Sequence, residues 1–282
     1  MITPQEGRPL LPAPLPGPVV DTHCHLDMCA AEDGPSVDDA LVLASEVGIT
    51  RIIQVGCDVP GSRWAAATAA EYENIWAAVA LHPNEAPRIH DEGGLILLEA
   101  AWREISELAE LPQVRAIGET GMDFYRTPTG GRAIQEESFR HHIQLAKRLG
   151  KALVVHDRES HDDVLRVLDD EGHPDAVVLH CFSGDAAFAA AASERGWYCS
   201  FAGVVTFKNA QDLREAAAVV PLEQLLVETD APFLTPAPYR GKPNASYLVP
   251  YTVRQIANLR DIPDLALAEA LYANSERAFG PL

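Results

Sequence analysis

Six residues of the types that bind divalent metal ions occur at wide intervals along the chain, namely His23, His25, Glu119, His156, His180 and Asp230. Imidazole nitrogens and carboxylate oxygens are the usual protein ligands of zinc and of related divalent ions. A lone histidine in a protein core is more often hydrogen-bonded to the backbone than bound to a metal. Six such residues at equivalent places in successive structural units predict a metal centre that activates water for hydrolysis.

The spacing of the first two histidines is informative by itself. In the segment Asp21-Thr-His-Cys-His-Leu-Asp27 they are two residues apart. Along a β-strand, residues i and i+2 project from the same side. If this segment is a strand, His23 and His25 therefore face one ion, while Cys24 faces away from it.

Short apolar runs lead up to these residues and predict the strands that position them. The runs are rich in Val, Ile and Leu without polar alternation, as is typical of parallel strands covered on both faces. Eight runs can be identified, at Val19–Leu26, Arg51–Cys57, Trp76–His82, Val114–Glu119, Ala152–His156, Ala176–His180, Trp197–Phe201 and Leu225–Thr229. The six residues lie at or near the carboxyl ends of their runs, and in a parallel barrel these ends open onto one face.

Helical patterns lie between the runs and again beyond residue 250. They are found at Asp38–Glu46, Ala65–Glu73, Leu95–Ala109, Ile134–Leu149, Asp162–Leu168, Asp185–Arg195 and Ala210–Val219. Gly150 follows the clearest of them and is a typical helix stop. Eight strand–helix units in about 260 residues predict an α/β fold of the (β/α)8 TIM barrel type. A doubly wound open sheet is the alternative, but no glycine-rich nucleotide-binding motif follows any run.

The rest of the composition describes the context of this domain. Residues 1–18 contain six prolines and are predicted to be a disordered tail before a single domain at 19–282. The five cysteines form no C-x-x-C pair, and there is no signal-peptide pattern and no long apolar run. A cytoplasmic protein with reduced thiols and no membrane partner is expected. Histidines on predicted helices or loops are expected to be ordinary surface residues: His90, His141, His142, His161 and His173.

Seven segments, ordered from the first predicted strand to beyond the last, give the chain a resemblance to a known family. They are Asp21–Asp27, Leu81–Pro83, Gly118–Tyr125, His156–Arg158, His180–Gly184, Glu228–Leu234 and Tyr239–Gly241. Each is a weak signal alone, but together they span nearly the whole predicted domain. The chain resembles the TatD family of metal-dependent deoxyribonucleases, within the wider amidohydrolase-like barrels.

This resemblance implies two ions with separate ligand sets. The first ion would bind to His23, His25 and Asp230, and the second to His156 and His180. The ions are expected to be magnesium, manganese or zinc, because imidazole favours zinc and manganese whereas carboxylates and phosphate also suit magnesium.

The resemblance also implies that Glu119 bridges the two ions. Related phosphotriesterases and dihydroorotases bridge their metals with a carboxylated lysine on the fourth strand. The run Val114–Glu119 contains no lysine. This difference favours the TatD branch over those neighbours.

Further catalytic and substrate-binding roles are predicted beside the ligands. Asp230 is the predicted general base, and His82, which ends the third run, is predicted to hydrogen-bond the scissile phosphate. Arg158, two residues after His156, is predicted to clamp a phosphate, with a neighbouring carboxylate as an equally good alternative partner. Arg240 resembles the phosphate-contacting arginine of the family, and the alternative is that it only anchors its loop.

One segment departs from the family pattern. After Tyr239–Gly241 relatives typically continue Lys/Arg-Asn-Glu-Pro, whereas this chain has Ala245 in place of that Glu. The metal-binding set is unchanged, so the difference concerns the shape of the substrate loop.

The leading hypothesis is a deoxyribonuclease, or another phosphodiesterase, that removes nucleotides from a 3′ end of DNA with a metal-activated water. The formal net charge of −19 argues against tight binding along a duplex and suits attack on a single-stranded end. An esterase or amidohydrolase, such as an aminoacyl-tRNA deacylase, is an alternative, because the same activated water serves those substrates. A third hypothesis, from a different functional class, is a non-catalytic barrel that acts as a scaffold. Such a protein would be expected to have lost some of the metal ligands.

Overall fold

A computed structural model describes residues 3–31 and 34–281 of the chain. Among these residues, eight strands follow one another in one sheet in the order of the sequence. They are β1 Val19–Cys24, β2 Ile49–Gly56, β3 Ile75–Val79, β4 Val114–Asp123, β5 Ala152–Arg158, β6 Val177–Leu179, β7 Tyr198–Phe201 and β8 Leu225–Val227. Each strand overlaps one of the eight predicted runs.

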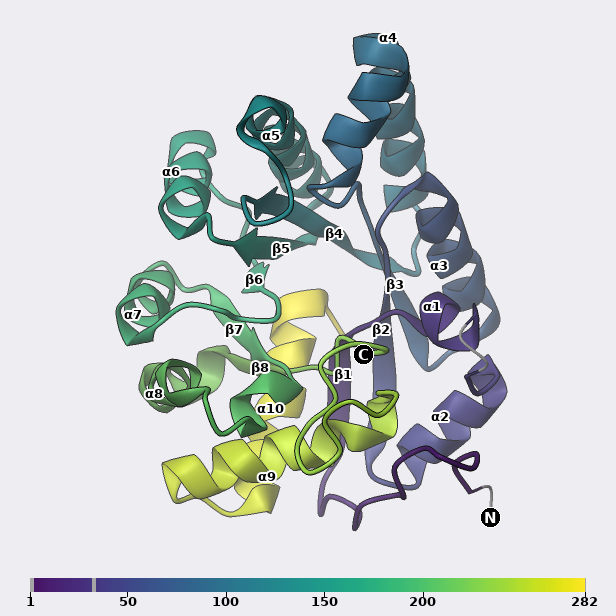
Figure 1. Ribbon diagram of the computed structural model, residues 1–282, viewed down its shortest axis with the longest axis vertical. Helices are drawn as coiled ribbons and strands as arrows, with labels where there is room; N and C mark the ends of the chain where they lie inside the picture. The colour runs from purple at the N-terminus through teal and green to yellow at the C-terminus, as the bar shows by residue number, and fades with distance from the viewer. Residues whose placement is uncertain (1–2, 32–33, 282) are drawn as a thin grey trace. The chain divides into compact units, whose positions relative to one another are not determined.

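Helices occupy the segments between the strands (Figure 1). They are α1 Leu26–Ala31, α2 Val37–Ser45, α3 Val59–Glu71, α4 Glu85–Ala109, α5 Arg132–Leu149, α6 His161–Glu171, α7 Ala186–Glu194, α8 Gln211–Val219, α9 Val249–Arg260 and α10 Asp264–Phe279. This alternation confirms the predicted α/β fold of the (β/α)8 TIM barrel type. No helix in the described part of the chain combines the length and apolar composition needed to cross a membrane.

The contacts of the chain divide it into two compact units, which are described separately. The first unit comprises residues 1–54 and 184–282. Within it, β1 pairs with β2 and β7 pairs with β8, in parallel. Every residue of β1 and of β8 is buried. Helix α10 packs against both of these strands (Figure 1).

The second unit comprises residues 55–183. Its strands β3, β4, β5 and β6 pair in parallel in that order. Every residue of β3 and β6 is buried. Helix α3 packs on β3 and α5 packs on β4 (Figure 1).

Local sequence signals explain where several helices begin and end. Asp58 begins α3 by accepting a hydrogen bond from the Gly61 N–H at 2.7 Å, as an N-terminal cap does. Gly150 ends α5 in the left-handed conformation, with φ 62°, which confirms the predicted stop. Helix α4 begins ten residues earlier than the predicted Leu95, and it is kinked at Gly94, which has φ 66°. This positive φ suits glycine, and it interrupts the helical periodicity.

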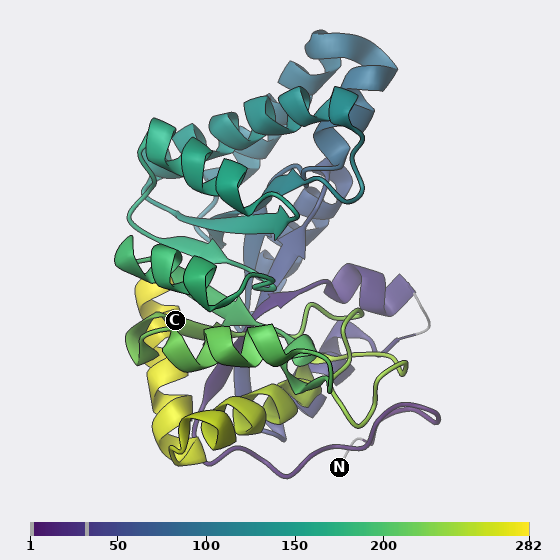
Figure 2. The ribbon, with the colours of Figure 1, turned by 60° about the vertical axis from the view of Figure 1, so that its left-hand side comes forward.

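The N-terminal segment has contacts with the first unit where disorder is predicted. Residues 1 and 2 lie outside the described residues. The Tyr247 hydroxyl donates to Pro9 O at 2.9 Å, and an Arg254 nitrogen donates to Ala13 O at 2.7 Å. Leu15 is buried, and its N–H donates to Val47 O. Figure 2 shows this purple segment passing beside α9.

His142 is buried, so its predicted surface position is wrong. The buried side of α5 contains Phe139, His142 and Ile143. His142 Nδ1 donates to Ser138 O at 2.7 Å, and Nε2 accepts from the Leu81 N–H at 3.2 Å. Burial lowers the pKa of His142 to about 3, and the neighbouring charge of His141 contributes.

The pKa of His142 predicts a contribution to acid sensitivity. Below its ordinary pKa of about 6.5 the unfolded chain binds a proton at this position, whereas the folded chain does not until the pH nears 3. The free energy of unfolding therefore falls as the pH drops from 7 to 5. Urea unfolding of His142→Gln should show a shallower fall, by up to about 1.4 kcal/mol per pH unit. Equal slopes for the two proteins would contradict the assignment.

Candidate metal centre

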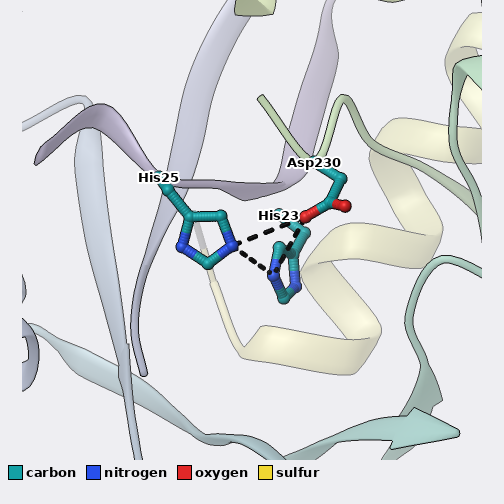
Figure 3. Close-up of side chains that lie close together, drawn as sticks. All are labelled: His23, His25 and Asp230. Carbon is teal, nitrogen blue, oxygen red and sulfur yellow. Dashed lines mark hydrogen bonds and ion pairs between the residues drawn. The ribbon is translucent and has the colours of Figure 1, made fainter. Parts of the chain in front are cut away.

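Three of the predicted ligands come together in the first unit. His23 Nε2 and His25 Nε2 lie 3.3 Å apart. Asp230 Oδ1 lies 3.8 Å from His23 Nε2 and 3.4 Å from His25 Nε2. Figure 3 shows both rings directed toward the Asp230 carboxylate. We call these three residues the His23 cluster.

The donor atoms of the His23 cluster fit a divalent ion. Ligand atoms bound tetrahedrally at about 2.1 Å from zinc lie about 3.4 Å from one another. The observed separations of 3.3 to 3.8 Å agree with this spacing. All three residues therefore offer donor atoms to the same position. Their role as ligands stays a prediction.

Backbone and side-chain hydrogen bonds hold the His23 cluster in place. The buried Asp21 carboxylate accepts from the Thr229 N–H at 2.8 Å and from the Thr229 hydroxyl at 2.6 Å. The Asp230 N–H donates to His23 O at 2.9 Å, so the residue after Thr229 is tied to β1. Asp230 itself has φ 53°, a left-handed conformation that aspartate tolerates better than most residues. These bonds fix the loop after β8 against β1.

Three further predicted ligands come together in the second unit. Glu119 Oε2 lies 2.6 Å from His180 Nε2 and 3.3 Å from His156 Nδ1. The two histidine nitrogens lie 3.3 Å apart. We call these residues the Glu119 cluster. Two of its donor separations, at 3.3 Å, match the spacing expected around one divalent ion, whereas the 2.6 Å between Glu119 Oε2 and His180 Nε2 is a hydrogen-bond distance. The bridging role of Glu119 between two ions stays a prediction.

The charge of Glu119 is set by its surroundings. Burial acts to raise its pKa, but the charges of His180 and His82 and hydrogen bonds from His156 and His180 hold it well below its usual range. The Cys57 thiol also donates to Glu119 Oε1 at 3.2 Å. The carboxylate is therefore ionised near neutral pH, as a metal ligand must be.

The pairing of β4 with β5 brings Glu119 and His156 together. The register shifts between Ile117 and Thr120, and Gly121 is the partner of His156. Gly121 has φ 135°, and a Cβ built there would lie 2.1 Å from His156 O. Only glycine permits this approach of the two strands. β4 also extends beyond the predicted end at Glu119 and reaches Asp123.

Asp123 is a residue that the sequence analysis missed. Its Oδ2 lies 3.4 Å from His156 Nε2, on the side of the ring opposite the Glu119 cluster. Burial acts to raise its pKa, but the neighbouring His156 and hydrogen bonds from the Arg126 N–H and Asn84 hold the pKa well below the usual range. Burial also acts to lower the pKa of His156, yet Asp123 and Glu119 raise it. The available signal was the even spacing of Glu119 and Asp123, which places both on one side of a strand.

His82 lies at the edge of the Glu119 cluster. Its Nδ1 accepts from the Asn84 N–H at 3.1 Å, which leaves Nε2 to bear the proton of the neutral ring. Nε2 lies 3.9 Å from Glu119 Oε1. Burial lowers the pKa of His82 to about 3, although Glu119 opposes this effect. Neutral His82 therefore presents an N–H donor at Nε2.

The two predicted phosphate-binding arginines stack on aromatic rings. The guanidinium carbon of Arg158 lies 4.0 Å from the Tyr125 ring centroid, and that of Arg240 lies 4.4 Å from the Phe207 centroid. Within residues 3–31 and 34–281, neither guanidinium has a carboxylate within ion-pair distance. The alternative carboxylate partner of Arg158 is therefore not found in this part of the chain.

The loop after β8 is held by Asn244, beside the position where the family glutamate is replaced. The buried Asn244 amide donates to Thr229 O at 2.9 Å and also to Phe233 O. Ala245 is buried, and its N–H donates to Asn244 Oδ1 at 2.9 Å. Replacement of the glutamate thus leaves this loop fixed by its neighbour.

Asp123 should strengthen metal binding at the Glu119 cluster. A carboxylate that accepts from the distal nitrogen of a ligand histidine orients the ring and increases its basicity, and its loss typically weakens metal affinity about 10- to 100-fold. Asp123→Asn should therefore raise the zinc dissociation constant by about this factor in a chelator-competition titration. Asp157→Asn is the matched control, because Asp157 bonds Ser160 and His161 in the adjacent loop. Equal zinc affinity in Asp123→Asn and the native chain would refute the role.

Comparisons with known proteins agree with the fold. The family model described as TatD related DNase matches residues 20–280, which span both units. The chain is 44% identical over 269 residues to the uncharacterised metal-dependent hydrolase TatD of Mycobacterium tuberculosis, covering 93% of this chain and 98% of that one. It is 32% identical over 250 residues to a protein of Citrobacter rodentium named 3′-5′ ssDNA/RNA exonuclease TatD, covering 86% and 91% of the two chains.

Solved structures give the same result. The crystal structure of YjjV, a TatD homologue from Escherichia coli, matches with a TM-score of 0.83 and 26% identity, covering 94% of this chain and 98% of the other. The family match and these relatives each cover most of the chain. The chain belongs to the TatD family of metal-dependent hydrolases.

Proposed function

We propose that this protein is a metal-dependent exonuclease that removes nucleotides from the 3′ end of single-stranded DNA. The observation that supports a phosphodiester substrate is that Arg158, two residues beyond His156, stacks on Tyr125 and has no carboxylate partner in the described residues. In a chain with 41 acidic residues and a formal net charge of −19, a guanidinium without a carboxylate partner in the described residues is available to an external anion. The relative from Citrobacter rodentium, named as an exonuclease, supports the same substrate class.

Each residue of the site has a proposed role in the hydrolysis of the phosphodiester. Divalent ions held by the His23 and Glu119 clusters would supply the Lewis acidity and positive charge that phosphodiester hydrolysis requires. Asp230, whose side chain is 14% exposed, is open to solvent and accepts the proton of the attacking water at a carboxylate oxygen. His82 donates its Nε2 hydrogen to a phosphate oxygen. Arg158 and Arg240 bind phosphate oxygens through their N–H groups.

Metal-restored trimming of single strands tests this proposal. Metal-stripped protein is incubated with a 3′-labelled or a 5′-labelled single-stranded oligonucleotide, with magnesium, manganese or zinc added in turn. We expect the 3′ label to be released first and the 5′-labelled strand to shorten stepwise. Glu119→Gln should lower the rate at least about 100-fold, because metal-based charge stabilisation contributes several kcal/mol. The exposed Glu137→Gln on α5 is the matched control.

Two outcomes would reject the nuclease assignment. One is the absence of cleavage with every metal although ions bind to the chain. The other is hydrolysis of an aminoacyl ester on tRNA by a protein that leaves both oligonucleotides intact, which would favour the deacylase alternative.

A further inference from the structure

Arginines and aromatic rings alternate in the loop between β4 and α5 and at the end of β5. The residues concerned are Phe124, Tyr125, Arg126, Arg132 and Arg158. All five lie in the second unit, immediately after residues that surround the Glu119 cluster. Arginines interleaved with aromatic side chains are the combination that binds single-stranded nucleic acid, because guanidinium groups bind phosphates and rings stack on bases.

Arg158 is ordered by a ring and not by a carboxylate. Its guanidinium carbon lies 4.0 Å from the centroid of Tyr125, well within the range of a cation–π interaction. Its sequence neighbours Asp157 and Glu159 do not pair with it, and Asp157 instead bonds Ser160 and His161. Stacking holds the guanidinium plane in place but leaves the positive charge and the N–H edge available to a phosphate.

Tyr125 presents an exposed ring on a fixed backbone. The residue is 62% exposed although Arg158 lies over its ring, so ring surface remains open to solvent. The preceding Phe124 N–H donates to Arg158 O at 2.9 Å, and the following Arg126 N–H donates to Asp123 Oδ1 at 2.8 Å. An aromatic side chain held in this way loses little conformational freedom when it binds a partner.

The rest of the loop is fixed from its other end. The guanidinium carbon of Arg132 lies 4.1 Å from the Phe124 ring centroid, and its Nη2 donates to Phe124 O at 3.5 Å. Asp123, which begins the loop, is the partner of Arg158 in the register of β4 and β5 and lies 3.4 Å from His156. The stacked pair is thus attached to the same two strands that hold two residues of the Glu119 cluster.

We propose that Tyr125 and Arg158 form a nucleotide subsite beside the Glu119 cluster. Arg158 binds a phosphate of a single-stranded nucleic acid, and the exposed ring of Tyr125 stacks on the adjoining base. A base inside a duplex is already stacked and paired, so this subsite selects for unpaired strands. The inference rests on the proposed exonuclease function, and it assigns the substrate preference to a named pair of side chains.

Removal of a single base tests the subsite directly. Single-stranded oligonucleotides are prepared with one abasic residue at each of the last positions before the 3′ end, and kcat/KM is measured with the native chain. An abasic residue at one particular position should lower kcat/KM about 5- to 150-fold, the range for one base stacked on an aromatic side chain. In Tyr125→Leu the intact oligonucleotide should be cleaved more slowly by a similar factor, and the abasic residue should cause no further loss.

Further variants separate stacking from general damage. Tyr125→Phe keeps the ring and should still discriminate between the intact and the abasic strand. Arg158→Lys keeps the charge but not the planar fork, and it should raise KM for both strands. Tyr272→Leu, on α10, is the matched control, since that helix contains none of the predicted site residues. Binding of each labelled strand to metal-stripped protein is measured in parallel by fluorescence anisotropy.

The two readouts distinguish failure of the subsite from failure of the proposed function. Cleavage that is insensitive to every abasic position, or equally sensitive in Tyr125→Leu, overturns the subsite and leaves the exonuclease in place. Absence of cleavage together with base-dependent binding that Tyr125→Leu abolishes supports the subsite and contradicts the exonuclease. Absence of both cleavage and base-dependent binding overturns both.

Discussion

Several polar side chains converge in each of the two clusters, and the structure around both depends on this constraint, because buried polar groups are costly unless each one has a partner. In the Glu119 cluster three donor atoms lie within 3.3 Å of one another. Such an arrangement persists only where the surrounding structure over-determines it. Paired strands, backbone hydrogen bonds and distal acceptors such as Asp123 all hold donor atoms that would otherwise separate.

In each unit, that unit's own strands and their hydrogen bonds hold the donor atoms close together. In the first, a buried aspartate joins β1 to the loop after β8, and backbone hydrogen bonds on either side of Asp230 complete the junction. In the second, the shifted register of β4 and β5 places Glu119 beside His156. Neighbouring residues then set the protonation of two histidines. Asp123 raises the pKa of His156. The Asn84 N–H donates to Nδ1 of His82, so the hydrogen of the neutral His82 ring lies on Nε2. The chemistry therefore depends on residues one step removed from the donors.

The sequence predicted the strands because their apolar runs are a recognisable signal, whereas the two ligand sets were implied by the family resemblance and stay a prediction. Apolar runs marked all eight strands. The predicted first strand included His25, whereas β1 ends at Cys24, although both histidine rings are directed toward Asp230. His142 was misplaced because a buried histidine whose two ring nitrogens bond to backbone groups cannot be distinguished from a surface histidine in a sequence. Asp123 was missed because β4 continues past the residue that ended its apolar run. The stacking of Arg158 on Tyr125 depends on pairing between strands, which a single sequence does not specify.

The close approach at Gly121 has a consequence for how this scaffold changes over evolution. Any side chain at that position would collide with the backbone of His156. The spacing of β4 and β5, which sets the distance between Glu119 and His156, therefore requires glycine there. The segments that leave the strands have no such restriction, and they include Ala245 and the loop between β4 and α5. A lineage built on this framework can acquire new substrates by exchanging loops while its reactive centre stays constant.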